Sequence, residues 1–143
     1  MGYLMKIGWF VYAIAGMISL GIMTLIFKQL LDKESKPELI LAFVFGLGMV
    51  FYLIQMLIAK TQVKVSWTVF LLLVLAAFLS YIGNLFVLKS LGLTPNPGYT
   101  MAIVGLNAIF ITLASLFLFG SKITLVKIAG VVCALLGLML LAI

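Results

Sequence analysis

The chain has 143 residues, of which 66% are apolar and only 8% are charged, and its mean hydropathy is +1.42. Soluble domains are about half apolar and a quarter charged, so these few charges cannot supply a water-facing surface. Disorder is excluded for the opposite reason, because disordered chains are poor in apolar residues. The composition therefore predicts an integral membrane protein.

The charged residues cluster between long uncharged runs. About 20 apolar residues are needed for a helix to cross the hydrocarbon core. The last run reaches this length only if it is counted from Ile123, because Lys127 can extend its ammonium toward the interface. The pattern predicts an all-α fold, a single domain over residues 1–143 with five transmembrane helices at about 7–30, 38–59, 66–89, 98–119 and 123–143.

Two other interpretations of these runs fit less well. Strands of a membrane β-barrel alternate apolar and polar residues, whereas these runs are apolar on all sides. A cleaved signal peptide has a shorter apolar core than the first run. Trp9 and Trp67 fall near two predicted helix starts, where interfacial aromatic residues are common.

The lysines are divided almost evenly between the two sides of the predicted membrane domain. Five lie on the N-terminal side and four on the other, namely Lys6, Lys60, Lys64, Lys122 and Lys127 against Lys28, Lys33, Lys36 and Lys89. Basic residues near helix ends favour the cytoplasm, so the N-terminus has a slight preference for that side. Insertion in both orientations stays open, and we expect a multi-pass protein of a prokaryotic plasma membrane.

The predicted membrane interior contains no acid, His or Arg. Ionisable groups at that depth usually mark proton and ion pathways, so a carboxylate-based exchanger is disfavoured. The chain also lacks a nucleophile–base set and a metal-ligand cluster, which argues against an enzyme and predicts no cofactor and no metal. The lysines are scattered over two membrane faces, so nucleic acid is not expected as a partner, and for Lys28 and Lys89 snorkelling is favoured over solute contact.

Neutral polar residues follow helical spacing on four of the predicted helices. A buried amide needs a hydrogen-bond partner, so these side chains either bond between helices or line a shared polar cavity near the midplane. For a single residue the first alternative is favoured, and for the set both stay open. The candidate solute-binding residues are Tyr12, Ser19, Tyr52, Gln55, Tyr81, Asn84 and Asn107.

The last predicted helix carries small residues at four-residue spacing instead of polar ones. Ala129, Cys133 and Gly137 form one such ladder, and Gly130 with Ala134 forms a second beside it. Small residues at this spacing let two helix backbones approach closely. The helix is predicted to serve packing or dimerisation, with packing inside one chain as the open alternative. The single cysteine excludes an intrachain disulfide and suits a packing role.

Several short motifs follow one another in the second half of the chain. They are Val87-Leu88-Lys89, Thr94-Pro95-Asn96-Pro97-Gly98-Tyr99, Leu118-Phe119-Gly120-Ser121-Lys122, Gly130 and Gly137. With these features, the stretch from Tyr81 onward resembles the C-terminal part of the EamA domain, in the drug/metabolite transporter superfamily. The family usually has Phe-Gly-Glu-Lys at the turn after the fourth helix, and Ser121 stands here in place of the Glu.

This resemblance implies a transporter that works in the lipid bilayer on a small-molecule solute. Family members commonly have two five-helix halves as inverted repeats. Because this chain supplies one such half, the resemblance implies a homodimer, and matching the ten-helix pattern requires antiparallel subunits. The small multidrug resistance family has a Glu in its first helix, whereas Tyr12 to Thr24 contains no acid, so proton-coupled cation export is not expected. We expect alternating access for a neutral, zwitterionic or amphipathic metabolite such as an amino acid. A scaffold or accessory subunit, and a lipid-linked sugar flippase subunit, are the alternatives.

Overall fold

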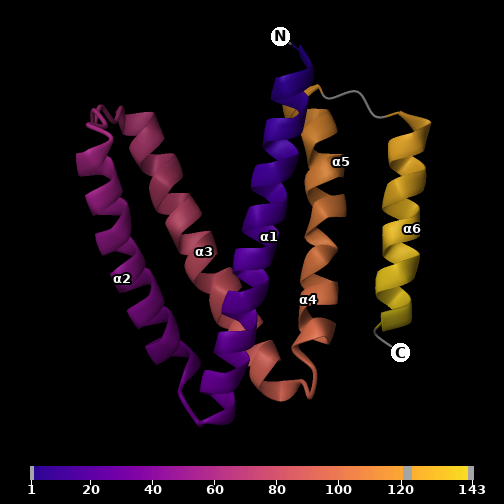
Figure 1. Cartoon of the computed structure of the whole chain (residues 1–143), viewed down its shortest axis with the longest axis horizontal. Coiled ribbons are helices and arrows are strands. Elements are labelled where there is room, and N and C mark those ends of the chain that lie inside the picture. Colours follow the sequence, from indigo (N-terminus) through magenta and orange to yellow (C-terminus); the bar gives the residue numbers. More distant parts are fainter. Residues whose placement is uncertain (1, 121–123, 142–143) are drawn as a thin grey trace. The chain divides into compact units, whose positions relative to one another are not determined.

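The computed structural model describes the backbone of residues 2–120 and 124–141, and these residues form six α-helices and no strand (Figure 1). The chain divides into two compact units, Met1–Leu93 and Thr94–Ile143. The first unit contains α1 to α3 and the second contains α4 to α6. The predicted all-helical class is therefore confirmed for the described residues.

The first unit consists of three long helices whose boundaries follow local chemistry. They are α1 at Gly2–Asp32, α2 at Pro37–Ile58 and α3 at Trp67–Leu93. Pro37 occupies the first turn of α2, where its missing N–H costs no hydrogen bond. Helix α3 continues past the predicted end at residue 89 and stops before Pro95, which disfavours helical geometry at the residue preceding it.

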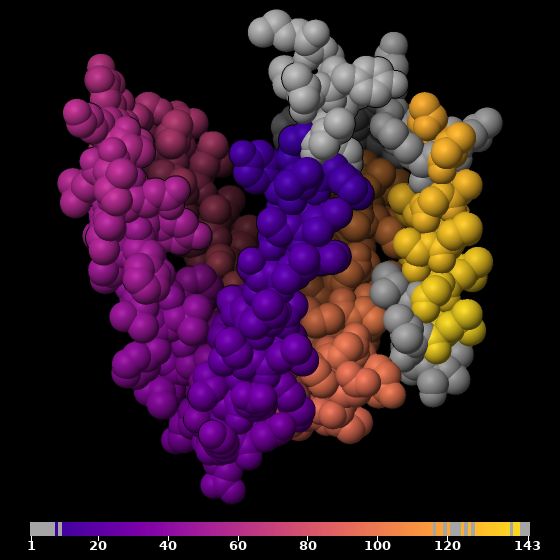
Figure 2. Space-filling model, in the orientation of Figure 1, coloured from indigo at the N-terminus to yellow at the C-terminus, as the bar shows by residue number. Residues whose placement is uncertain are grey.

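The three helices converge at one end of this unit, where α1 ends and α2 begins (Figure 1). The buried side chains of the unit lie there: Thr24, Phe27, Ile40, Leu41, Leu88 and Leu91. Away from this end, α1 diverges from α2, as the space-filling view also shows (Figure 2). Most large apolar side chains of the three helices are exposed there, so they are available to lipid or to another protein surface.

The second unit contains α4 at Pro97–Gly105, α5 at Asn107–Phe119 and α6 at Leu125–Leu141. The prediction of one continuous helix over 98–119 is wrong in one respect, because the helical segment is interrupted at Leu106. The N–H of Leu106 donates to the carbonyl of Ile103 at 3.1 Å, a three-residue spacing in place of the α-helical four. Gly105 precedes the break, and glycine is among the weakest helix formers.

Four segments of the described chain are long and apolar enough to cross a membrane. They are Phe10–Asp32, Pro37–Ile58, Trp67–Leu93 and Pro97–Ser115, the last formed by α4 and α5 together. The apolar helical run in α6, Ile128–Gly137, is shorter. A multi-pass membrane protein is thus supported, while the fifth span stays a prediction, since residues 123, 142 and 143 of that span lie outside the described chain.

Candidate functional site

A groove of about 550 Å³ lies between the first half of α2 and the middle of α3. On α2 its lining residues follow the spacing i, i+3, i+4 and i+7, which places them on one helix face. Its walls are formed by Glu38, Leu41, Ala42 and Phe45 from α2 and by Ala77, Ser80, Tyr81 and Leu85 from α3. The volume falls within the range typical of small-molecule sites.

The walls of the groove are mainly apolar, with a few polar groups. Five of the eight lining residues carry aliphatic or aromatic hydrocarbon side chains, and Ser80 and Tyr81 add hydroxyl groups. Glu38 adds one carboxylate at the first turn of α2. Small-molecule sites commonly combine an apolar lining with a few polar groups that fix orientation. The groove therefore suits a solute that is partly apolar.

The side chain of Asn84 holds the Ser80 hydroxyl from one turn away on α3. Its Nδ2 donates to the Ser80 carbonyl at 2.8 Å and to Ser80 Oγ at 3.2 Å. The predicted cluster of Ser80, Tyr81 and Asn84 thus contributes two residues to the groove wall, and Asn84 contacts one of them. The Asn84 amide thus orients the Ser80 hydroxyl through this hydrogen bond.

Two charged side chains from different helices meet beside the groove. Glu38 Oε1 lies 3.9 Å from Lys89 Nζ, and the two side chains are 59% and 52% exposed. This separation exceeds hydrogen-bond distance, so both groups keep their hydrogen-bonding capacity. The sequence predicts a snorkelling role for Lys89 at a helix end and no site role for Glu38. The spacing of Glu38 with Leu41, Ala42 and Phe45 is the signal that identifies its face.

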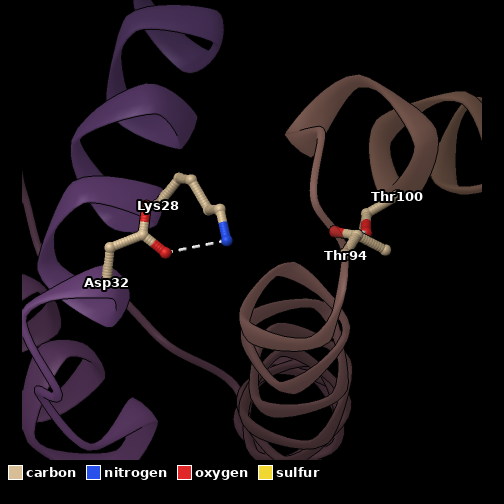
Figure 3. A network of polar contacts seen from close by, with 4 residues as sticks. All are labelled: Lys28, Asp32, Thr94 and Thr100. Atoms are coloured by element: carbon tan, nitrogen blue, oxygen red, sulfur yellow. Dashed lines mark hydrogen bonds and ion pairs between the residues drawn. The ribbon is translucent and has the colours of Figure 1, made fainter.

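A second ion pair at the converging end of this unit is closed. Lys28 Nζ lies 2.8 Å from Asp32 Oδ1 within α1, and the Lys28 side chain is only 17% exposed (Figure 3). Pairs of this spacing on a helix surface add modest stability. Because its ammonium is already hydrogen-bonded to a carboxylate, this closed pair has less hydrogen-bonding capacity left for a solute than the open pair of Glu38 and Lys89.

The other predicted solute-binding residues do not line the groove. Tyr12 is 81% exposed on α1, and the Ser19 hydroxyl donates to the Ala15 carbonyl of its own helix at 2.9 Å. Tyr52 and Gln55 are exposed in the second half of α2, and the exposed Asn107 begins α5 of the other unit. The groove therefore includes Tyr81, and Asn84 through Ser80, whereas a solute contact by the other five residues stays a prediction.

In the second unit, a space of about 340 Å³ separates α4 and α5 from α6. It is lined by Gly105, Ala108, Ile109, Thr112, Gly130, Val131 and Ala134. Gly130 and Ala134 of one ladder thus line a space that α4 and α5 also line, while Ala129, Cys133 and Gly137 do not line it. Both ladders are exposed, so a packing or dimerisation role for either stays a prediction.

The start of α4 is fixed by side-chain oxygens. Asn96 Oδ1 accepts a hydrogen bond from the Gly98 N–H at 2.9 Å, which caps the helix. The hydroxyls of Thr94 and Thr100 lie 3.2 Å apart, and Thr100 is buried (Figure 3). Among the described residues no group of three or more His, Cys, Asp or Glu side chains is placed to hold a metal ion.

Comparison with known proteins identifies a family. The model of the EamA-like transporter family matches residues 7–143, which covers both units and includes the groove. No curated protein and no solved structure gives a significant match. Membership of this family supports a membrane transporter type of function. The resemblance carried by the sequence motifs is confirmed, and the chain belongs to the EamA-like transporter family.

Proposed function

We propose that the protein transports small neutral, zwitterionic or amphipathic metabolites, such as amino acids, and that two copies work together by alternating access. The observation that supports this solute class is the groove between α2 and α3, with apolar walls, two hydroxyl groups and a carboxylate. Such a lining binds a hydrocarbon portion by burial and orients a polar group by hydrogen bonds.

The proposal of a dimer is supported by the exposed surfaces of the chain. The ladder of Ala129, Cys133 and Gly137 on α6 does not line the space inside the second unit, and small residues at this spacing favour close contact between helices. In ten-helix relatives an inverted repeat supplies the second half of the site. The division of five lysines against four permits the antiparallel arrangement.

Uptake into liposomes tests the transport proposal. The purified protein is reconstituted and offered a panel of radiolabelled metabolites that includes leucine. We expect saturable uptake of at least one amphipathic solute, and we expect Ala77→Phe to abolish it because the larger side chain fills the groove. Ala76→Phe is the matched control, since the neighbouring Ala76 is exposed and lies outside the lining. Folded protein that moves no solute supports the scaffold alternative instead.

Subunit orientation is tested separately with a side-specific reporter on each terminus. The antiparallel dimer predicts that each reporter is found on both sides of the membrane. If every copy reports the same orientation, the antiparallel arrangement is refuted, while the transport proposal is judged by uptake alone.

A further inference from the structure

We propose that Glu38 and Lys89 form the head-group site for a free amino acid with an apolar side chain, which would lie in the groove between α2 and α3. The inference rests on the proposed transport function and narrows its solute to a zwitterion. It follows from three observations: an open ion pair, its place at one end of an apolar groove, and the shared helix faces that join the two.

The first observation is the geometry of the pair. The 3.9 Å between Glu38 Oε1 and Lys89 Nζ leaves the carboxylate without a short contact to this ammonium, and both side chains are more than half exposed. Charge-assisted hydrogen bonds are shorter than 3 Å, so each group has unused capacity for one. A pair of opposite charges side by side is complementary to a ligand that also carries opposite charges side by side.

The amino-acid head group has this arrangement. Its ammonium and carboxylate are attached to the same carbon, so the ammonium can face Glu38 while the carboxylate faces Lys89. The four charges then alternate around a ring, and each neighbour is of opposite sign. A ligand with only one charge satisfies one member of the pair and places its charge near a second one of like sign. The pair therefore favours a zwitterion over an amine or an acid.

The second and third observations place the ligand's side chain. Lys89 follows Leu85, Tyr81 and Ala77 at four-residue intervals on α3, and these three residues line the groove. Residues at this interval share a helix face. On α2, Glu38 is itself a lining residue and precedes Leu41, Ala42 and Phe45 on the same face. A head group bound at the pair thus has the apolar walls directly beside it.

The alternative use of these charges is structural, as a bridge between α2 and α3. The closed pair of Lys28 and Asp32, at 2.8 Å, shows the geometry of a structural pair in this unit. The open pair is longer and spans two helices. Exposed ion pairs of this kind contribute little to stability, so removing one charge is expected to leave the fold intact and to act on the ligand.

The test uses three compounds with the same branched hydrocarbon tail and the full chain in detergent. Binding of tritiated leucine is competed with unlabelled leucine, with 3-methylbutylamine, which has only the positive charge, and with 4-methylpentanoate, which has only the negative charge. The inference predicts that leucine competes about tenfold better than either analogue. This comparison needs no variant, so it does not depend on the folding of one.

Variants then assign the two charges. Glu38→Gln removes the partner of the ammonium, and Lys89→Gln removes the partner of the carboxylate. We expect each to weaken leucine binding about tenfold, with the amine losing affinity only in the first and the acid only in the second. Asp32→Asn is the matched control, since Asp32 carries a charge of the closed pair outside the groove lining, and it should leave leucine binding unchanged.

Three results overturn the inference. They are equal competition by the two analogues and leucine, unchanged leucine binding in both Glu38→Gln and Lys89→Gln, and no leucine binding by the folded wild-type protein. The proposed transport function is judged independently by the wider uptake panel. If the folded protein binds no leucine but takes up a solute that lacks the zwitterionic head group, the head-group site is refuted and the transport function stands.

Discussion

Replacement of Asn84 by leucine tests how the polar part of the groove is built. Among the described residues, the amide Nδ2 donates hydrogen bonds to Ser80 alone, at its carbonyl and its hydroxyl. The Ser80 carbonyl also accepts the regular α-helical hydrogen bond from the N–H four residues later. Loss of the additional hydrogen bond from the Asn84 amide therefore costs little stability. The remaining effect is the release of the Ser80 hydroxyl, which lines the groove.

The size of this effect follows from one hydrogen bond. Such bonds between side chains in membrane proteins are worth about 0.6 kcal/mol and at most about 1.7 kcal/mol. Asn84→Leu is therefore expected to weaken leucine binding by about 3- to 20-fold. Global stability should change by less than about 1 kcal/mol, because leucine is favourable in an apolar surrounding and offsets the lost contact.

A double-mutant cycle measures the coupling between the two residues. Competition binding is compared for Asn84→Leu, Ser80→Ala and the combination of both. Because Asn84 acts through Ser80, the double variant should bind leucine no more weakly than Ser80→Ala alone. Additive losses would refute this reasoning and would indicate that Asn84 contacts the solute itself. Thr68→Ala is a suitable control, since Thr68 is exposed on α3 and lies outside the groove lining.

Three further predictions concern stability and assembly. Leu88→Ala should lower the free energy of unfolding by about 2 to 5 kcal/mol, because Leu88 is only 1% exposed. Leu93→Ala should lower it far less, because Leu93 is 88% exposed. Equal losses in the two variants would contradict the assigned core. Gly120 has a left-handed φ of 57° at the end of α5, so Gly120→Ala should destabilise the protein by about 1 to 2 kcal/mol. Gly46→Ala should be neutral or stabilising, because nothing lies within 4 Å of the added carbon. Thermal unfolding measures both variants. If α6 pairs with α6 of a second copy at Cys133, oxidation of membranes should link the two thiols into a dimer on a non-reducing gel, since this thiol is exposed on α6. Absence of the cross-linked dimer would contradict direct contact between the two copies at Cys133.

The positions of the long helices follow from the charge map of the sequence. Residues 38–59 are predicted for the second span, and α2 occupies Pro37–Ile58, because Pro37 and the flanking lysines set its limits. The break at Leu106 is not predictable from hydropathy, since the run stays apolar through it. Gly105 gives only a weak propensity signal, and such signals are routinely overridden by tertiary context.

The site is only partly predictable for a different reason. Helical spacing shows which residues share a face, and the predicted proximity of Ser80 and Asn84 on α3 agrees with their hydrogen bonds. It does not show which helix lies opposite. Glu38 lies in the first turn of α2, and only the pairing of α2 with α3 places it in the groove wall. Tyr52 and Gln55 lie on α2 beyond the end of this groove.

Solute counterflow with the wild-type protein tests the central claim most directly. Proteoliposomes are loaded with unlabelled leucine and diluted into a trace of labelled leucine. A transporter that alternates its access exchanges the two, so labelled leucine should accumulate transiently inside and then decline. Uptake equal to that of protein-free liposomes, with folded protein present and with every other solute of the panel also failing, would contradict the assignment of transport to this chain.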